Sequence, residues 1–208
     1  MTRGSKYLGE GKTETIILPD EFVAEKERKG PRREIGPRKR VLTIKEIEHL
    51  ESLLREAFNY ITELKKREAL AAHIQYPKTP PILTESAVVH LRERLFPGSL
   101  SARFGGREGD IFLQFPNGER HVEVKATGEH GFEDFSEKDV RADWMVWIHF
   151  GTVLRKGSGD VVLFKFENPG KMFKEGRVNL EKVLKAVPEK QMTKITGSSL
   201  IEIIRVNS

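Results

Sequence analysis

The stretch GDIFLQFPNGERHVEVKA, residues 109–126, decides which fold the chain is expected to adopt. Apolar and β-favouring residues dominate Asp110–Phe115 and again His121–Ala126, which is typical of two short strands. Pro116–Glu119 stands between them and contains Asn-Gly, a pair that tolerates the positive φ of hairpin turns. The stretch therefore predicts a β-hairpin.

The expected register of this hairpin brings charged residues together. With the turn centred on Asn117-Gly118, Asp110 is expected to face Lys125, and Phe112 is expected to face Glu123. Because side chains alternate along a strand, Glu123 and Lys125 share one face of the sheet. Asp110 would approach them from the neighbouring strand.

Two carboxylates and an ammonium at one strand end suit metal-assisted chemistry. A hard cation such as Mg²⁺ prefers oxygen ligands, which Asp110, Glu123 and the carbonyl of Val124 would supply. The metal would polarise a phosphate and acidify its bound water, while Lys125 would hold that water or offset the developing charge. A third carboxylate is expected from Glu85, in a helix before the hairpin. The simpler alternative is an exposed sheet face with one Asp–Lys pair.

Together these residues resemble the signature of the PD-(D/E)xK nuclease superfamily, which includes restriction endonucleases, Holliday-junction resolvases and repair nucleases. Gly109-Asp110-Ile111, the hairpin and Glu123-Val124-Lys125 carry the resemblance. The helical Glu85 is similar to a glutamate that many members have, and Phe132–Phe150 is similar to their helix-then-strand continuation. The match covers about residues 84–166, and it departs from the family at Gly109, where a Pro is often found.

The resemblance implies an α/β/α core and hydrolysis of DNA phosphodiester bonds that leaves a 5′-phosphate. It also implies dependence on Mg²⁺, with Mn²⁺ as a substitute. By the same resemblance Asp110, Glu123 and Lys125 are the expected catalytic residues, together with Glu85, which it supports more weakly.

Several nearby side chains are candidates for contact with DNA. Arg103 and Arg107 precede Asp110 and could clamp phosphate or read guanine, although a solvated loop explains them equally well. His130 follows the second strand and could approach DNA, whereas most such histidines only occupy a loop. His121 is expected to be exposed at the turn end of its strand, away from Asp110.

The region before the hairpin combines a basic segment with helices. Residues 1–40 predict an arm, in which Lys26–Arg40 (KERKGPRREIGPRKR) could neutralise phosphates or be merely solvated. Residues 16–18 are apolar and predict either a strand or a patch that packs on the body. Thr43 with Glu46 predicts a capping box that begins a helix to about Ala72.

The remaining elements predict an α/β fold. A Pro-rich linker, Tyr76–Pro81, is followed by a helix that Thr84 would cap and that Pro97-Gly98 would end. Trp144 and Trp147 are expected in the core. Further strands are predicted at Ser101–Phe104, Trp144–Phe150, Val161–Phe166 and Leu200–Val206, and further helices at Ser136–Ala142 and Asn179–Ala186.

This order predicts a mixed central β-sheet flanked by helices, a restriction-endonuclease-like core with an N-terminal helical and basic extension. The expected division is an arm over residues 1–40, the long helix and linker over residues 41–82, and a nuclease core over residues 83–208.

Composition is compatible with a protein that acts on nucleic acid. The 208 residues are 38% hydrophobic and 32% charged, with a net charge of +5. The absence of cysteine excludes disulfides and thiolate metal sites. No apolar run approaches the roughly 18 residues of a membrane span. The opening MTRGSKYLGEGKTE contains no signal-like apolar segment, so a cytoplasmic location in a prokaryotic-type cell is expected.

Three functions follow from the sequence. The first is a type II restriction endonuclease that cuts double-stranded DNA as a homodimer, with one active site for each strand of a palindrome. The second is a structure-specific nuclease, such as a junction resolvase or repair enzyme. The third is a DNA-binding module without catalysis, which has little reason to hold two carboxylates against phosphate.

Overall fold

The computed structural model describes residues 3–8, 12–17, 39–105 and 109–207. The chain forms two compact units, Met1–Arg38 and Lys39–Ser208. In the first unit, strand β1 (Arg3–Leu8) pairs antiparallel with strand β2 (Lys12–Ile17). Residues 16 and 17 of the apolar patch, expected either in a strand or packed on the body, therefore end β2, whereas residue 18 and most of the predicted basic segment lie outside the described residues.

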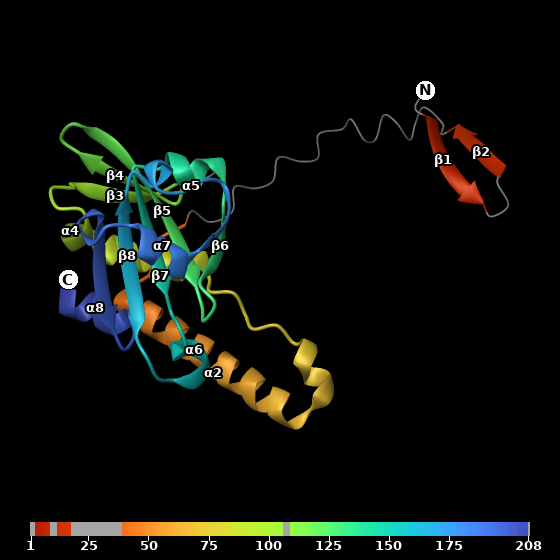
Figure 1. Cartoon of the computed structure of the whole chain (residues 1–208), viewed down its shortest axis with the longest axis horizontal. Helices are drawn as coiled ribbons and strands as arrows, with labels where there is room; N and C mark the ends of the chain where they lie inside the picture. The colour runs from red at the N-terminus through yellow and green to blue at the C-terminus, as the bar shows by residue number, and fades with distance from the viewer. Residues whose placement is uncertain (1–2, 9–11, 18–38, 106–108, 208) are drawn as a thin grey trace. The chain divides into compact units, whose positions relative to one another are not determined.

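A six-stranded sheet forms the centre of the Lys39–Ser208 unit (Figure 1). In sheet order the strands are β10 (Met192–Gly197), β8 (Val161–Glu167), β7 (Trp144–His149), β5 (Gly118–Thr127), β4 (Ile111–Phe115) and β3 (Ser101–Phe104). Strands β5 and β7 are parallel and all other neighbours are antiparallel. The prediction of an α/β fold with a mixed central sheet is confirmed.

The parallel pair requires a crossover between β5 and β7, because parallel strands cannot be joined by a tight turn. The crossover contains strand β6 (Phe132–Phe135) and helix α5 (Glu137–Arg141). Strand β6 pairs with β9 (Gly176–Asn179) in a separate two-stranded sheet. This connection carries α5 to the end of the hairpin where the candidate site lies.

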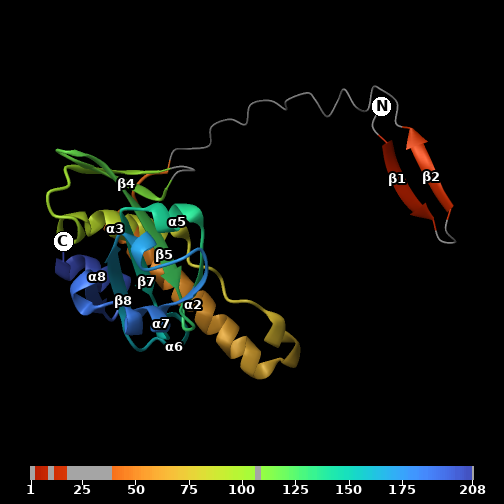
Figure 2. The ribbon, with the colours of Figure 1, turned by 45° about the horizontal axis from the view of Figure 1, so that its top comes forward.

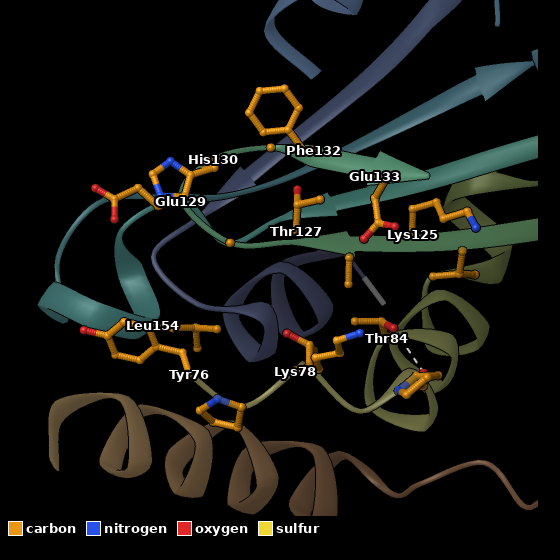
Figure 3. A pocket seen from close by; sticks show the side chains of 18 of the residues that line it. Tyr76, Lys78, Thr84, Lys125, Thr127, Glu129, His130, Phe132, Glu133 and Leu154 are labelled. Atoms are coloured by element: carbon orange, nitrogen blue, oxygen red, sulfur yellow. Dashed lines mark hydrogen bonds between the residues drawn. The ribbon is translucent and has the colours of Figure 1, made fainter. Parts of the chain in front are cut away.

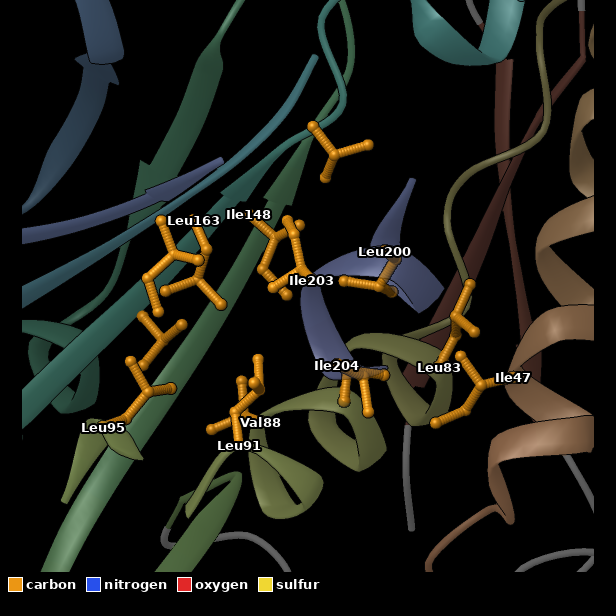
Figure 4. Close-up of a cluster of buried hydrophobic side chains, with 14 of the residues drawn as sticks. Ile47, Leu83, Val88, Leu91, Leu95, Ile148, Leu163, Leu200, Ile203 and Ile204 are labelled. Carbon is orange, nitrogen blue, oxygen red and sulfur yellow. The ribbon is translucent and has the colours of Figure 1, made fainter. Parts of the chain in front are cut away.

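Helices cover one face of the sheet. Helices α2 (Ile44–Arg67), α3 (Pro81–His90) and α8 (Leu200–Asn207) contact one another there and share one hydrophobic core with the sheet. Figure 4 shows that core, with Ile203 of α8 close to Ile148 of β7 and Val88 of α3 beside Leu91. The far end of α2 extends beyond the sheet (Figures 1 and 2).

A second core covers the opposite face. It includes Trp147 of β7, Phe135 of β6 and Leu180 of helix α7 (Leu180–Ala186). Because β7 contributes to both cores, its apolar run has no polar face, as expected for a central strand. The remaining short elements are α4 (Arg92–Leu95), α6 (Val153–Lys156), and the 3₁₀ turns η1 (Ala69–His73), η2 (Pro169–Lys171) and η3 (Glu189–Gln191).

Local capping signals in the sequence agree with the structure. The Thr43–Glu46 capping box begins α2, the Ser136–Asp139 capping box begins α5, and Asn179 caps α7. Helix α2 ends at Arg67, short of the predicted Ala72, and continues as a 3₁₀ turn. These caps join residues only three positions apart, so a short sequence pattern is enough to predict them.

The predicted cap of the second helix, Thr84, was four residues late, because the cap is Pro80. Helix α3 begins at Pro81, whose fixed φ suits the first helical position. Thr84 is therefore not the cap: it is buried inside the helix, and its Oγ1 donates to the carbonyl of Pro81 at 3.1 Å. The helix still presents Glu85 toward the interior, where this side chain is 2% exposed.

The predicted closing strand at Leu200–Val206 was wrong, because this segment is helix α8. The last strand of the sheet is β10, which precedes it. The Glu51 carboxylate of α2 accepts hydrogen bonds from the backbone N–H groups of Leu200 and Ile201, both at 3.2 Å. These donors are free at a helix start, so a distant carboxylate stabilises the helix over the strand.

The hairpin register also differs from the prediction, by two residues. Ile111 pairs with Val122 and Phe115 pairs with Gly118, so Pro116 and Asn117 form the turn. Gly118 takes the positive φ, at +126°. A shift of two residues keeps every side chain on its predicted face but moves Asp110 beside Glu123 instead of Lys125.

Among the described residues, no helix is long and apolar enough to cross a membrane.

Candidate active site

The predicted catalytic residues lie where strand β4 begins. Pairing between β4 and β5 stops at Ile111 and Val122, so the Asp110 side chain reaches the part of β5 that β4 leaves unpaired. Oδ2 of Asp110 accepts a hydrogen bond from the backbone N–H of Val124 at 2.9 Å. The N–H and C=O of one strand residue point to the same edge, so the Val124 carbonyl also points toward Asp110.

Glu123 is the most deeply buried acidic side chain of the site, at 0% exposure. Its Oε1 lies 2.7 Å from Nε2 of His121, and its Oε2 lies 3.1 Å from Nζ of Lys138. Burial, together with the nearby charge of Asp110, raises the pKa of Glu123 above the ordinary glutamate value. The contacts with His121 and Lys138 act against this rise.

Lys125 follows on the same strand and is held by helix α5. Its Nζ lies 2.8 Å from Oδ1 of Asp139, which is 1% exposed. Oδ2 of Asp139 accepts from the backbone N–H and the hydroxyl of Ser136, at 2.6 and 2.8 Å. Burial acts to raise the pKa of Asp139, but the ion pair with Lys125 and the hydrogen bonds from Ser136 outweigh it and hold that pKa low.

Lys138 was not among the residues expected in the site. Its ammonium lies 3.1 Å from Glu123 and 3.4 Å from Asp110, between the two carboxylates. Burial acts to lower the pKa of Lys138, but these two carboxylates outweigh it and raise that pKa, so the side chain is a cation. No local sequence signal distinguishes Lys138, since only the crossover brings α5 to this strand end.

Glu85 of helix α3 joins the same electrostatic cluster. Both of its carboxylate oxygens lie 3.2 Å from Nζ of Lys39, a residue of the predicted basic segment that was not expected at the catalytic site. Burial raises the pKa of Glu85 and Lys39 is the main group that opposes it, while the charge of Asp110 raises this pKa and that of Lys138 lowers it to a smaller extent. The third carboxylate expected from the upstream helix therefore lies within reach of the Asp110 and Lys138 charges.

His121 corrects a prediction. It was expected to be exposed and away from Asp110, but its side chain is 16% exposed, contacts Glu123 and stacks on Phe112 at 5.1 Å. A Cβ added to Gly109 would lie 2.0 Å from Nε2 of His121. The imidazole thus covers the backbone next to Asp110, which explains why glycine, and not proline, precedes the aspartate.

The three residues predicted to contact DNA lie in different places. Arg103 pairs with Glu119 at 2.8 Å and lies over the Phe112 ring at 4.4 Å, on the hairpin. His130 is exposed in the loop after β5. Arg107 lies outside the described residues.

A groove of about 1060 Å³ opens beside the site, and Asp110, Val124, Lys125 and Lys138 contribute to its lining. In Figure 3, Lys125 and Thr84 lie toward one end, while Glu129, His130 and Tyr76 lie toward the other. The basic residues of its lining are Lys78, Lys125, Lys138, His130, Arg155 and Arg177. The groove therefore leads from the carboxylates past several cationic side chains.

The chemistry of the donor groups decides whether a divalent metal fits. Among residues 39–105 and 109–207, no group of three or more acidic or histidine side chains is arranged to hold a metal. Mg²⁺, however, is commonly held by one or two carboxylates and completed by waters and phosphate oxygens. The carboxylates of Asp110 and Glu123 both lie close to the Lys138 ammonium. Oε2 of the buried Glu123 has no hydrogen bond of good geometry within the described part of the chain. The pair is thus compatible with such a metal.

No protein-family model, no curated protein and no solved structure matches this chain. The resemblance to PD-(D/E)xK nucleases remains a prediction from the residues quoted above.

Proposed function

We propose that this protein is a metal-dependent nuclease that hydrolyses phosphodiester bonds in DNA. One observation carries the proposal: the carboxylates of Asp110 and Glu123 converge on a single cationic position, with Lys125 held on the same strand at the side of an open groove. Two converging carboxylates can hold a hard metal, and a neighbouring lysine can act on the water or the phosphate that such a metal binds.

Asp110, Glu123 and the carbonyl of Val124 would hold Mg²⁺, or Mn²⁺ in its place. Bound there, the ion would polarise the scissile phosphate and acidify a coordinated water. The N–H of Val124 fixes one oxygen of Asp110, and His121 orients Glu123 through Oε1. These two contacts leave Oδ1 of Asp110 and Oε2 of Glu123 directed at the shared cationic position.

Lys125 and Glu85 would act around that position. Asp139 holds the Lys125 ammonium in place, where it can retain the attacking water or stabilise negative charge on the phosphate. Glu85 is buried with a raised pKa, so it would serve as a further acidic group that orients water. Lys138 already neutralises the two carboxylates. Lys125 is therefore proposed to act on the water or the phosphate and not as a counter-ion.

The substrate in this proposal is double-stranded DNA cut at a specific sequence by a homodimer. The chain's net charge of +5 supports a polyanionic substrate, and the groove offers basic side chains beside its acidic ones, Asp110, Glu129, Glu133 and Asp134. A dimer would match the two-fold symmetry of a palindromic site.

The test is cleavage of long linear duplex DNA and of branched DNA, with Mg²⁺ or with a chelator. Wild-type protein is compared with Asp110→Asn and with a control, Asp160→Asn, at an exposed aspartate beside β8. Discrete duplex fragments that require both Mg²⁺ and Asp110 would support the sequence-specific enzyme. Cleavage of branched DNA alone would indicate a structure-specific nuclease. Binding without any cleavage would overturn the proposal and indicate a DNA-binding module.

A further inference from the structure

The ammonium of Lys138 occupies the position that the proposed metal would take. It lies 3.1 Å from Oε2 of Glu123 and 3.4 Å from Oδ1 of Asp110, the two oxygens directed at that position. The contact to Glu123 is an ion pair, and its angles fall outside those of a hydrogen bond. The lysine therefore neutralises both carboxylates with a single long hydrogen bond, from its Nζ to Oδ1 of Asp110 at 3.4 Å.

A buried carboxylate pair needs a cation when no metal is bound. Glu123 is fully buried and Asp110 is 21% exposed, so their mutual repulsion is only partly screened by water. The other lysines near the site are engaged: Lys125 pairs with Asp139, and Lys39 pairs with Glu85. Within the described part of the chain, Lys138 is the lysine paired with both Asp110 and Glu123.

Lys138 is also placed to leave. Its side chain is 41% exposed, it projects from the short surface helix α5, and it lines the open groove. A lysine ammonium sits on a flexible four-carbon stem, so it can rotate into the groove without movement of the backbone. Asp110 and Glu123, by contrast, are held by Val124 and His121.

We infer that Lys138 is an internal counter-ion of the metal site: its ammonium takes the place of the divalent cation in the metal-free protein, and the metal must displace it. This inference rests on the proposed function, because the metal site itself is part of that proposal. Loss of the Lys138 charge should remove a competitor and so strengthen metal binding.

The test is calorimetric titration of the metal-free full-length protein with Mg²⁺ alone, in the absence of DNA. Lys138→Met removes the charge and keeps an unbranched side chain, while Lys138→Arg retains a cation. Lys185→Met is the matched control, because Lys185 also pairs with a carboxylate, Glu181 at 2.7 Å, but both of these side chains are exposed. We expect Lys138→Met to lower the Kd for Mg²⁺ about tenfold, since a unit charge a few Å from the ion is removed. Lys138→Arg and Lys185→Met should stay near the wild-type value.

The outcomes separate this inference from the proposed function. Tighter binding by Lys138→Met that disappears in the double variant Asp110→Asn/Lys138→Met supports the inference. Equal, measurable Kd values for wild type and Lys138→Met overturn it and leave the metal site intact. No Mg²⁺ binding by either protein overturns the inference and the metal-dependent function together. Should Lys138→Met fail to fold without metal, Lys138→Gln is titrated in its place.

Discussion

The ammonium of Lys125 lies 2.8 Å from Oδ1 of Asp139, and this contact joins strand β5 to helix α5. The other oxygen of the same carboxylate caps α5 by accepting from the N–H and hydroxyl of Ser136. One buried side chain therefore both starts a helix and positions the proposed catalytic lysine. Substitution of Asp139 and of Ser136 can separate the role of this carboxylate in helix stability from its role in positioning Lys125.

Replacement of Asp139 should impair the proposed cleavage more than replacement of Ser136. Asp139→Asn removes the charge that holds Lys125, so kcat should fall at least about tenfold, with a smaller change in KM for DNA. Ser136→Ala removes the hydroxyl cap at a cost of about 1 kcal/mol but leaves the Lys125 contact, so its kcat should stay near wild type. Urea unfolding and cleavage kinetics on both variants check this. Equal losses of kcat would show that only the stability of α5 matters.

Loss of Lys125 itself should abolish cleavage while DNA binding largely survives. Lys125→Met removes the ammonium that would act on the water or phosphate, but it leaves Asp110 and Glu123 in place. Cleavage and electrophoretic mobility shift assays are compared with Lys185→Met, an exposed ion-paired control. Retained cleavage would remove Lys125 from the mechanism.

Gly109 should be intolerant of any side chain because of its contact with His121. A Cβ at Gly109 would lie 2.0 Å from Nε2 of His121, whose ring is confined by Phe112 and Glu123. Gly109→Ala should therefore lower the free energy of unfolding by about 1–3 kcal/mol.

A double-variant cycle locates the cause of that loss. Gly109→Ala should cost much less in a His121→Ala background, where the clashing ring is gone. Gly128→Ala is the control, since a Cβ there meets nothing within 4 Å. Urea denaturation of the single and double variants measures the coupling, and additive losses would contradict the predicted contact.

His149 should make the folded protein sensitive to mild acid. Burial lowers the pKa of this half-buried imidazole, whose Nδ1 lies 3.0 Å from Oγ1 of Thr127. The unfolded chain then binds a proton more readily than the folded chain, so stability is full above the ordinary histidine pKa of 6.5 and is lost as pH falls toward the lower folded pKa.

Unfolding experiments between about pH 8 and pH 5 check the histidine prediction. His149→Gln should flatten the loss of stability on acidification, while His130→Gln, in an exposed loop, should leave it unchanged. A slope that is the same in wild type and His149→Gln would contradict it.

Features that depend on neighbours in the sequence were predictable from the sequence alone. The capping boxes at Thr43–Glu46 and Ser136–Asp139 each need hydrogen bonds across three residues. The β4–β5 hairpin needs only alternation and a turn, and so Glu123 and Lys125 were placed on one face correctly even though the register was two residues off. Local hydrogen bonds and side-chain alternation are the same in any tertiary environment, which is why these expectations held.

Features that depend on contacts between residues far apart in the chain were decided only by the tertiary structure. The apolar segment Leu200–Val206 suits a strand or a helix. Ser199 caps it locally, and the Glu51 carboxylate, far away in the chain, accepts from its first two backbone N–H groups. The crossover that carries α5 to β5 placed Lys138 between Asp110 and Glu123, and put Asp139 beside Lys125. Contacts between residues remote in the chain depend on how helices and strands pack together. The sequence of one segment does not show which charged side chain of another segment will lie beside it.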